Sequence, residues 1–392
     1  MLKLGVIGYG GRIRGVLEEI YRLTDQAVVT AITDTRIEQI REELTTADQN
    51  AGRDIKREYF QDADEMLDAT PLDGVLIGTR CSLHARMAVK VLKRNLPLYL
   101  EKPVATNMDD LVALRDAGAA ATSETVVSFP LRVTPLVRVA KEIIDSGQLG
   151  TIEHVQAWNN VPYGAVYYQD WYRDENETQG LFLQKATHDF DYINYLLGYT
   201  PVTVAAMNAK QIMKGDMPAG QRCADCPKWE TCLESPYHNY VTKQEAHQVR
   251  PNHLMCCFAV DTGNEDSGSA LVQYHTGMHV SYTQNFFVRK SAGIRGARLM
   301  GYKGTLEFDW YTDTIKVIMH HAPRVETIHC PGGVGHGGGD TVLADSFVRI
   351  LTGRGHSAAP LDSGLISCLI CLKAKESART QTFQSIVWPD QT

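Results

Sequence analysis

The sequence predicts an α/β fold: a doubly wound parallel sheet in residues 1–130, then an α+β domain with a large, mostly antiparallel sheet in residues 131–392. Three observations lead to this prediction. Strand and helix patterns alternate over the first hundred residues, a glycine loop separates the first strand from the first helix, and long strand-like runs dominate the second half. Alternation is typical of parallel strands joined by crossover helices, whereas consecutive strands favour antiparallel pairing.

The first part contains apolar runs of strand length separated by amphipathic runs of helix length. The expected strands are Leu2–Ile7, Ala27–Thr33, Asp73–Gly78 and Pro97–Leu100, and the expected helices are Arg12–Leu23, Thr35–Thr45 and Leu83–Lys93. The carboxyl ends of such strands share one edge of the sheet, and ligands of open α/β sheets bind there.

The second part begins near Leu131, where the alternation stops. Its expected elements are a helix at Pro135–Ser146, a helix at Leu183–Leu197, strands at Gly268–Tyr274, His279–Phe287, Gly304–Asp309 and Thr314–His320, and a closing helix at Thr341–Leu351. A cysteine-rich insertion is expected at about 215–257. Runs of strands followed by a helix indicate an α+β domain.

The composition is that of an ordinary globular protein, with 44 % hydrophobic and 22 % charged residues in a chain of 392. The formal net charge of −7 argues against a nucleic-acid or anionic-membrane partner. No apolar run reaches the length of a membrane-spanning helix, and the first residues read as a strand rather than a signal peptide. We therefore expect a cytoplasmic protein that acts on a small molecule.

A glycine-rich loop follows the first strand and opens the first helix. It consists of Gly8, Tyr9, Gly10, Gly11, Arg12 and Ile13. Glycine permits a tight turn and a close approach to a pyrophosphate, while the free N–H groups of the helix start bind phosphate. Asp34 closes the second strand, where an acid accepts hydrogen bonds from ribose hydroxyls and favours NAD over NADP. Arg36 leaves NADP as the less favoured alternative, and a Rossmann-like turn that binds nothing is the other.

Several further landmarks follow in order along the chain. They are the pair Thr79 and His84, the triplet Glu101-Lys102-Pro103, Arg132, the turn Gly147–Ile152 and the run His188-Asp189-Phe190-Asp191. With the glycine loop, they make the chain resemble the glucose–fructose oxidoreductase / inositol dehydrogenase (Gfo/Idh/MocA) family over nearly its whole length. The resemblance implies an NAD-binding Rossmann domain and catalysis by Lys102 beside the nicotinamide. It also implies that Thr79, Arg80, His84 and Glu101 surround the cofactor.

The position of Lys102 agrees with a catalytic role. It follows an apolar strand at the edge where ligands bind, and Pro103 restricts its backbone to an extended conformation. A partly desolvated lysine near the cationic nicotinamide ring is expected to have a lowered pKa and can exchange a proton with a carbinol. The alternative is a solvated loop lysine.

The helix expected at Leu183–Leu197 carries the second candidate catalytic residue, His188. One face is apolar (Ala186, Phe190, Ile193 and Leu197), and the other carries Gln184, His188, Asp191 and Tyr195, with Lys185 at the margin. Asp191 lies one turn from His188, which predicts that its carboxylate orients the imidazole. The resemblance implies that this histidine assists proton transfer, yet Gln184 stands where many relatives have an aspartate.

The substrate is expected to contact Gln184, Lys185, Asp191, Arg132, Arg173 and His336. The cations among them favour an anionic or strongly hydroxylated substrate. For Arg173 an equally good interpretation is a surface ion pair with Asp170 or Asp174. His336 lies in a glycine-rich stretch that is as typical of a flexible loop as of a site.

Nine cysteines are present, and several cluster in the insertion. Cys223, Cys226, Cys232 and Cys256 predict a structural zinc site, with Cys257 or His238 as alternatives for the fourth ligand. Unligated thiols are the other interpretation because the spacing is irregular.

The sequence thus predicts an NAD-dependent oxidoreductase for a secondary alcohol of a sugar, glycoside or cyclic polyol, with Lys102 and His188 handling the proton. Two alternatives stay open. One is an NAD-dependent glycoside hydrolase that works by transient oxidation, elimination, hydration and reduction, including on sulfated or sulfonated sugars. The other is a sensor without catalysis, which the Lys102 and His188 pair disfavours. A large antiparallel sheet also suggests a homodimer or tetramer.

Overall fold

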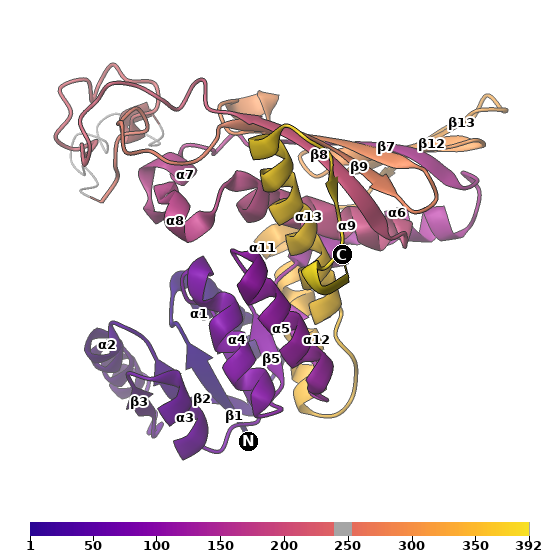
Figure 1. Ribbon diagram of the computed structural model, residues 1–392. Helices are drawn as coiled ribbons and strands as arrows, with labels where there is room; N and C mark the ends of the chain where they lie inside the picture. Colours follow the sequence, from indigo (N-terminus) through magenta and orange to yellow (C-terminus); the bar gives the residue numbers. More distant parts are fainter. Residues whose placement is uncertain (239–252, 392) are drawn as a thin grey trace.

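The structure is a computed structural model that describes residues 1–238 and 253–391. The described residues form two sheets, one parallel and six-stranded, the other mixed and nine-stranded (Figure 1). The predicted fold class, a parallel Rossmann sheet followed by a large and mostly antiparallel sheet, is confirmed. Residues 239–252 of the cysteine-rich insertion lie outside the described residues.

The parallel sheet has the strand order β3-β2-β1-β4-β5-β6, the doubly wound order of dinucleotide-binding folds. Its strands are Leu2–Ile7 (β1), Ala27–Thr33 (β2), Glu58–Phe60 (β3), Gly74–Ile77 (β4), Leu98–Leu100 (β5) and Thr125–Val127 (β6). Its helices are Gly11–Leu23 (α1), Ile37–Asn50 (α2), Ala63–Ala69 (α3), His84–Lys93 (α4) and Met108–Ala120 (α5). Strands β3 and β6 were not predicted from the sequence because each is only three residues long and begins with a polar residue, unlike the equally short but wholly apolar β5.

The mixed sheet has the order β14-β13-β12-β11-β7-β10-β9-β8-β15. Its strands are Ile152–Asn160 (β7), Pro201–Ala209 (β8), Ser267–Tyr274 (β9), His279–Asn285 (β10), Ile294–Gly301 (β11), Gly304–Asp309 (β12), Thr314–Met319 (β13), Val325–His329 (β14) and Gln384–Ser385 (β15). Strands β7 and β10 pair in parallel, and the other neighbours are antiparallel. Helices Pro135–Asp145 (α6) and Thr187–Leu197 (α9) lie between this sheet and the parallel sheet (Figure 1).

Two C-terminal helices connect the halves of the molecule. Helix Gly339–Leu351 (α12) packs on α1, and helix Leu361–Thr380 (α13) contacts α5 and β6 on one side and β8 and α9 on the other. Helix α13 packs so closely against the first half of the chain that a Cβ added to Gly364 would lie 2.7 Å from the side chain of Val104. The sequence analysis did not predict α13, and its division of the chain at residue 130 stays a prediction.

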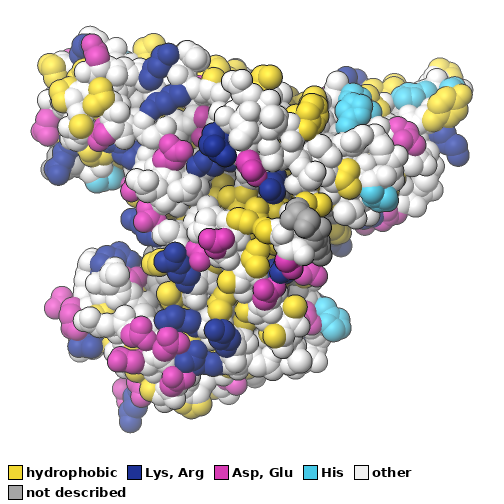
Figure 2. Space-filling model, viewed as in Figure 1, with side chains coloured by type: hydrophobic (Ala, Val, Ile, Leu, Met, Phe, Trp, Pro, Cys, Tyr) yellow, Lys and Arg dark blue, Asp and Glu magenta, His cyan; other side chains and the backbone are white. Residues whose placement is uncertain are grey.

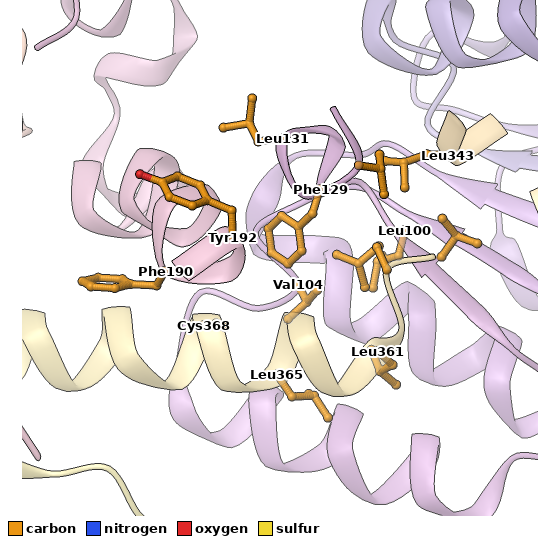
Figure 3. Close-up of a cluster of buried hydrophobic side chains, with 14 of the residues drawn as sticks. Leu100, Val104, Phe129, Leu131, Phe190, Tyr192, Leu343, Leu361, Leu365 and Cys368 are labelled. Atoms are coloured by element: carbon orange, nitrogen blue, oxygen red, sulfur yellow. The ribbon is translucent and has the colours of Figure 1, made fainter. Parts of the chain in front are cut away.

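Buried side chains from both halves meet around α13. Val104 and Phe129 come from the first half, Phe190 lies on α9, and Leu365 and Cys368 lie on α13 (Figure 3). They belong to one continuous hydrophobic core that extends from the parallel to the mixed sheet. On the surface, hydrophobic side chains gather at the waist between the two halves (Figure 2). Among the described helices, none has the length and apolar composition needed to cross a bilayer.

Candidate active site

A cleft of about 600 Å³ lies at the carboxyl ends of the parallel strands, where they face the helices under the mixed sheet. Most of the residues predicted for the site line this cleft. They are Gly10, Gly11, Arg12, Thr79, Arg80, His84, Glu101, Lys102, Gln184, Lys185, His188 and His336. Residues more than 300 positions apart in the chain therefore meet in one cavity.

The glycine loop forms a cradle that fits a pyrophosphate. Gly8 has a φ of +85°, and a Cβ there would lie 2.6 Å from the backbone nitrogen of Thr79, so only glycine fits. In contrast, a Cβ on Gly11 would meet nothing within 4 Å, which means that the space above this residue is open to a ligand. Helix α1 begins at Gly11 without a side-chain cap, so its first N–H groups remain available to phosphate.

Asp34 follows β2 beside this cradle. Its carboxylate accepts hydrogen bonds from the backbone nitrogens of Tyr9 and Arg36, both at 2.8 Å. Burial opposes ionisation, but the hydrogen bonds from Arg36 and Tyr9 lower the pKa of Asp34. This ionised and positioned carboxylate is suited to accept hydrogen bonds from ribose hydroxyls. Together, Asp34 and the open glycine cradle form a site that fits NAD.

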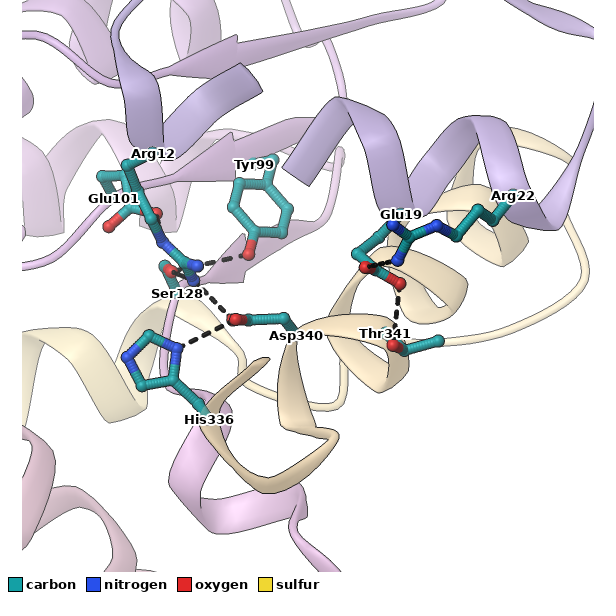
Figure 4. A network of polar contacts seen from close by, with 9 residues as sticks. All are labelled: Arg12, Glu19, Arg22, Tyr99, Glu101, Ser128, His336, Asp340 and Thr341. Carbon is teal, nitrogen blue, oxygen red and sulfur yellow. Dashed lines mark hydrogen bonds and ion pairs between the residues drawn. The ribbon is translucent and has the colours of Figure 1, made fainter. Parts of the chain in front are cut away.

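Arg12 ties the cradle to two distant elements (Figure 4). Its Nε donates to Glu101 at 2.8 Å, and its Nη2 donates to Asp340 of α12 at 2.6 Å and to Ser128 at 2.9 Å. His336 contacts the other oxygen of Asp340 at 2.9 Å. Sequence reasoning missed Ser128 and Asp340 because no local pattern links position 12 to position 340.

Lys102 follows β5 and lines the cleft, with its side chain half-buried. Its Nζ donates to the backbone oxygen of Gln184 at 3.2 Å. Burial, with a further contribution from the charge of Lys185, lowers the pKa of Lys102 to about 8. A lysine with that pKa is partly neutral near neutral pH and can accept a proton.

His188 lies opposite, near the start of α9, after a wide π-helical turn over Phe182–Ala186. Only 7 % of the residue is exposed, and its Nδ1 is buried without a hydrogen-bond partner in the described part of the chain. Burial and the nearby charge of Lys102 hold the pKa of His188 well below its usual value, so the ring is neutral. An unpaired buried nitrogen at a cleft is a natural partner for a substrate hydroxyl.

Three predicted substrate contacts lie elsewhere. Asp191 does not orient His188, because its carboxylate binds Arg132 through two contacts of 2.9 Å, and both side chains are buried. Arg173 pairs with Asp261 at 2.6 Å rather than with Asp170 or Asp174. Neither Arg132, Asp191 nor Arg173 is among the residues that line the cleft.

Gln184 does line the cleft, but its amide is already engaged. Its Nε2 donates to the backbone oxygen of Thr178 at 3.1 Å and lies 3.4 Å from the sulfur of Cys81. A carboxamide has no basic group at neutral pH, and this one has a structural partner. Gln184 is therefore not a candidate for proton transfer in this cleft.

An aromatic wall that the sequence analysis missed faces these residues. It consists of Tyr163, Tyr167, Trp171 and Tyr172. Trp171 and Tyr172 stack with ring centroids 3.9 Å apart, and Arg80 lies over the Trp171 ring at 4.1 Å. The density of aromatic residues in 163–172 is a visible signal in the sequence, since aromatic rings commonly line ligand pockets.

The cysteines of the insertion gather, but the zinc prediction is not supported. Backbone hydrogen bonds bring Cys223 and Cys256 together, and with Cys226, Cys232 and Cys257 they line a cavity of about 20 Å³. Within residues 1–238 and 253–391, however, no group of three or more His, Cys, Asp or Glu side chains is arranged to hold a metal ion. Burial and the neighbouring cysteines raise the pKa of Cys223 to about 12, as expected of a protonated thiol.

Three known proteins are similar to this chain in sequence or in fold. YteT of Bacillus subtilis, described as an oxidoreductase, is 27 % identical over 330 residues, which cover 74 % of this chain and 75 % of YteT. Myo-inositol 2-dehydrogenase of Thermotoga maritima is 25 % identical over 197 residues. That match covers 50 % of this chain and about half, 55 %, of the relative.

The fold is shared with levoglucosan dehydrogenase in complex with NADH and levoglucosan, at a TM-score of 0.75 and 18 % identity. The superposition covers 98 % of this chain and 99 % of that one. None of these three proteins is described as a glycoside hydrolase, so the hydrolase alternative has no support from them. Residues 2–129 match the NAD-binding Rossmann fold of the oxidoreductase family, and residues 137–307 match the Gfo/Idh/MocA C-terminal domain. The chain therefore belongs to the Gfo/Idh/MocA family of NAD-binding oxidoreductases.

Proposed function

We propose that the protein oxidises a secondary alcohol of a sugar or cyclic polyol. The observation that carries this proposal is that Lys102 and His188, whose buried Nδ1 has no hydrogen-bond partner among the described residues, both line the cleft that the glycine cradle opens into. The dehydrogenases among its relatives act on inositol and levoglucosan, a cyclic polyol and an anhydrosugar.

Each part of the cleft has a defined task in this reaction. Lys102 in its neutral form accepts the proton of the reacting hydroxyl, and neutral His188 holds the same oxygen by a hydrogen bond. The aromatic wall packs against the apolar face of the sugar ring and excludes water. Bound NAD⁺ would supply the hydride acceptor, held by Gly10, Gly11 and Asp34.

The test is NADH formation, followed by its absorbance, with a panel of sugars, cyclic polyols and aryl glycosides and with NAD⁺ or NADP⁺. We expect NADH from at least one sugar or polyol, with NAD⁺ preferred. Lys102→Ala should lower kcat by about 10²-fold or more, because it removes the proton acceptor. Lys373→Ala is the matched control, since Lys373 pairs with Glu376 on α13 outside the cleft.

Unchanged turnover in Lys102→Ala would contradict the assigned site. Release of the aglycone from aryl glycosides without accumulation of NADH would contradict net oxidation.

A further inference from the structure

Lys185 is a cleft residue that the proposed reaction does not use. It belongs to the π-helical turn before α9, is 7 % exposed and lines the cleft with Lys102 and His188. Its ammonium donates to the hydroxyl of Tyr163 at 2.7 Å and lies over the rings of Tyr163 and Tyr167 at 4.8 and 5.3 Å. In the described part of the chain it forms no ion pair with a carboxylate.

The acids near Lys185 are already neutralised. Glu101, which lines the cleft, binds Arg12 at 2.8 Å. Asp189, a buried residue of α9, binds Arg295 at 2.8 Å. Burial opposes the charge of Lys185, while Tyr167 and Tyr163 raise its pKa, and an anionic ligand would add the full counter-charge that the tyrosines do not supply.

The Tyr163 hydroxyl adds a donor at the same point. An ammonium can only donate, so the Tyr163 oxygen is the acceptor in its contact with Lys185 and its own O–H is free to donate elsewhere. Tyr163 is 52 % exposed as a residue and lines the cleft. The ammonium and the phenol together offer donors to a ligand and no charged acceptor.

The electrostatic environment of Tyr163 favours negative charge. Burial raises the pKa of the phenol, but the charges of Lys185 and Arg295 outweigh this effect and lower it. The other groups that face it are Tyr167, whose pKa burial raises, Asp189, which Arg295 neutralises, and Tyr311, whose pKa is raised to about 12 by burial and by Tyr163. A carboxylate placed beside Tyr163 would experience the same stabilising field.

We infer that the substrate is a sugar acid whose carboxylate binds between the Lys185 ammonium and the Tyr163 hydroxyl. This inference rests on the proposed oxidation and names its substrate class. A single ammonium matches a singly charged carboxylate, whereas a phosphate dianion usually requires several cationic or backbone donors. With its acid group held at Lys185, the sugar ring would lie along the aromatic wall and present a hydroxyl to Lys102 and His188.

Paired substrates test this inference. Two pairs of sugars differ only in the group that Lys185 would bind: glucose and glucuronate, and galactose and galacturonate. Two further anionic substrates, glucose 6-sulfate and glucose 6-phosphate, test whether another acid group is preferred. We expect kcat/KM for an acid to exceed that for its neutral partner by at least about tenfold, because a partly buried charge pair forms only with the acid. Lys185→Met should reduce this ratio at least about tenfold, Lys185→Arg should retain most of it, and Lys373→Met should leave it unchanged.

Calorimetric titration of the NADH-loaded enzyme with each sugar gives the same comparison without turnover. Tighter binding of the acid in the wild type, lost in Lys185→Met, supports the inference even when no sugar is oxidised. Equal or better binding of neutral sugars overturns it and leaves the proposed oxidation standing. A preference for the sulfate or phosphate ester overturns the assignment to a carboxylate. If none of the sugars yields NADH, the proposed oxidation is overturned instead. The calorimetric comparison of acids with neutral sugars then tests the inference by itself.

Discussion

At the scale of single residues, burial has opposite consequences at Lys102 and at Arg132. Lys102 has no carboxylate partner, so desolvation lowers its pKa and makes it reactive. Arg132 is more deeply buried, at 5 % exposed, but its guanidinium is paired with Asp191 and serves the structure. Helical spacing correctly placed Asp191 one turn from His188, but it cannot reveal what lies across from the helix. His188 therefore lines the cleft, whereas Asp191 on the same helix forms a structural ion pair.

The lowered pKa of Lys102 predicts the pH dependence of alcohol oxidation. Only the neutral amine accepts a proton, so kcat/KM should rise about tenfold per pH unit below pH 8 and level off above it. Initial rates of NADH formation between about pH 6 and about pH 10 measure this profile. In Lys102→Arg the side chain stays charged over the whole range, so activity should be lost without recovery at high pH. A wild-type profile that is flat through pH 8 would contradict the assignment.

At the scale of elements, the sequence predicts best where one face of an element is buried and the other is exposed. Helices α1, α4 and α6 have this pattern, and their predicted bounds agree with the structure to within one residue at each end. Helix α13 is packed from both sides, and residues 367–371 are all buried, so its sequence has no polar face to reveal a helical period. The cleft's aromatic wall was not predicted from periodicity for a different reason, since it lies on turns of three or four residues after β7, which are too short to show a helical period.

The ion pair between Arg132 and Asp191 should anchor α9 to the segment after β6. Arg132→Met leaves a buried carboxylate unpaired, and we expect a loss of about 3–5 kcal/mol in the free energy of unfolding. Urea unfolding followed by circular dichroism measures it. The double variant Arg132→Met/Asp191→Leu removes both charges and should lose less than the single one. A single-variant loss below about 1 kcal/mol would show that the pair contributes little.

At the scale of the whole molecule, large apolar side chains are exposed around a hollow on the mixed sheet. Met207, Leu271 and Phe383 are 80, 51 and 72 % exposed, and they border a hollow of about 700 Å³ on β8, β9 and β10. Exposed apolar patches of this kind commonly mark protein–protein interfaces. The homodimer or tetramer expected from the sequence would cover this face.

Leu271→Arg should therefore dissociate the oligomer, because it places a charge among the exposed apolar side chains Met207, Leu271 and Phe383. Light scattering coupled to size exclusion measures the mass. Leu233→Arg is the matched control, since Leu233 is 81 % exposed but lies in the cysteine-rich insertion. A monomeric wild-type protein at micromolar concentration, or an unchanged mass for Leu271→Arg, would rule out this interface.

The bridging position of α13 has a consequence for how molecules enter and leave. A hinge motion that separated the two halves would pull Leu365 and Cys368 away from Val104 and Phe129. It would expose the hydrophobic core that the halves share to water. Such a hinge motion is therefore energetically unfavourable. Ligands would instead enter with the two halves together, and the half-exposed Tyr163, which lines the cleft, is a side chain that they would contact.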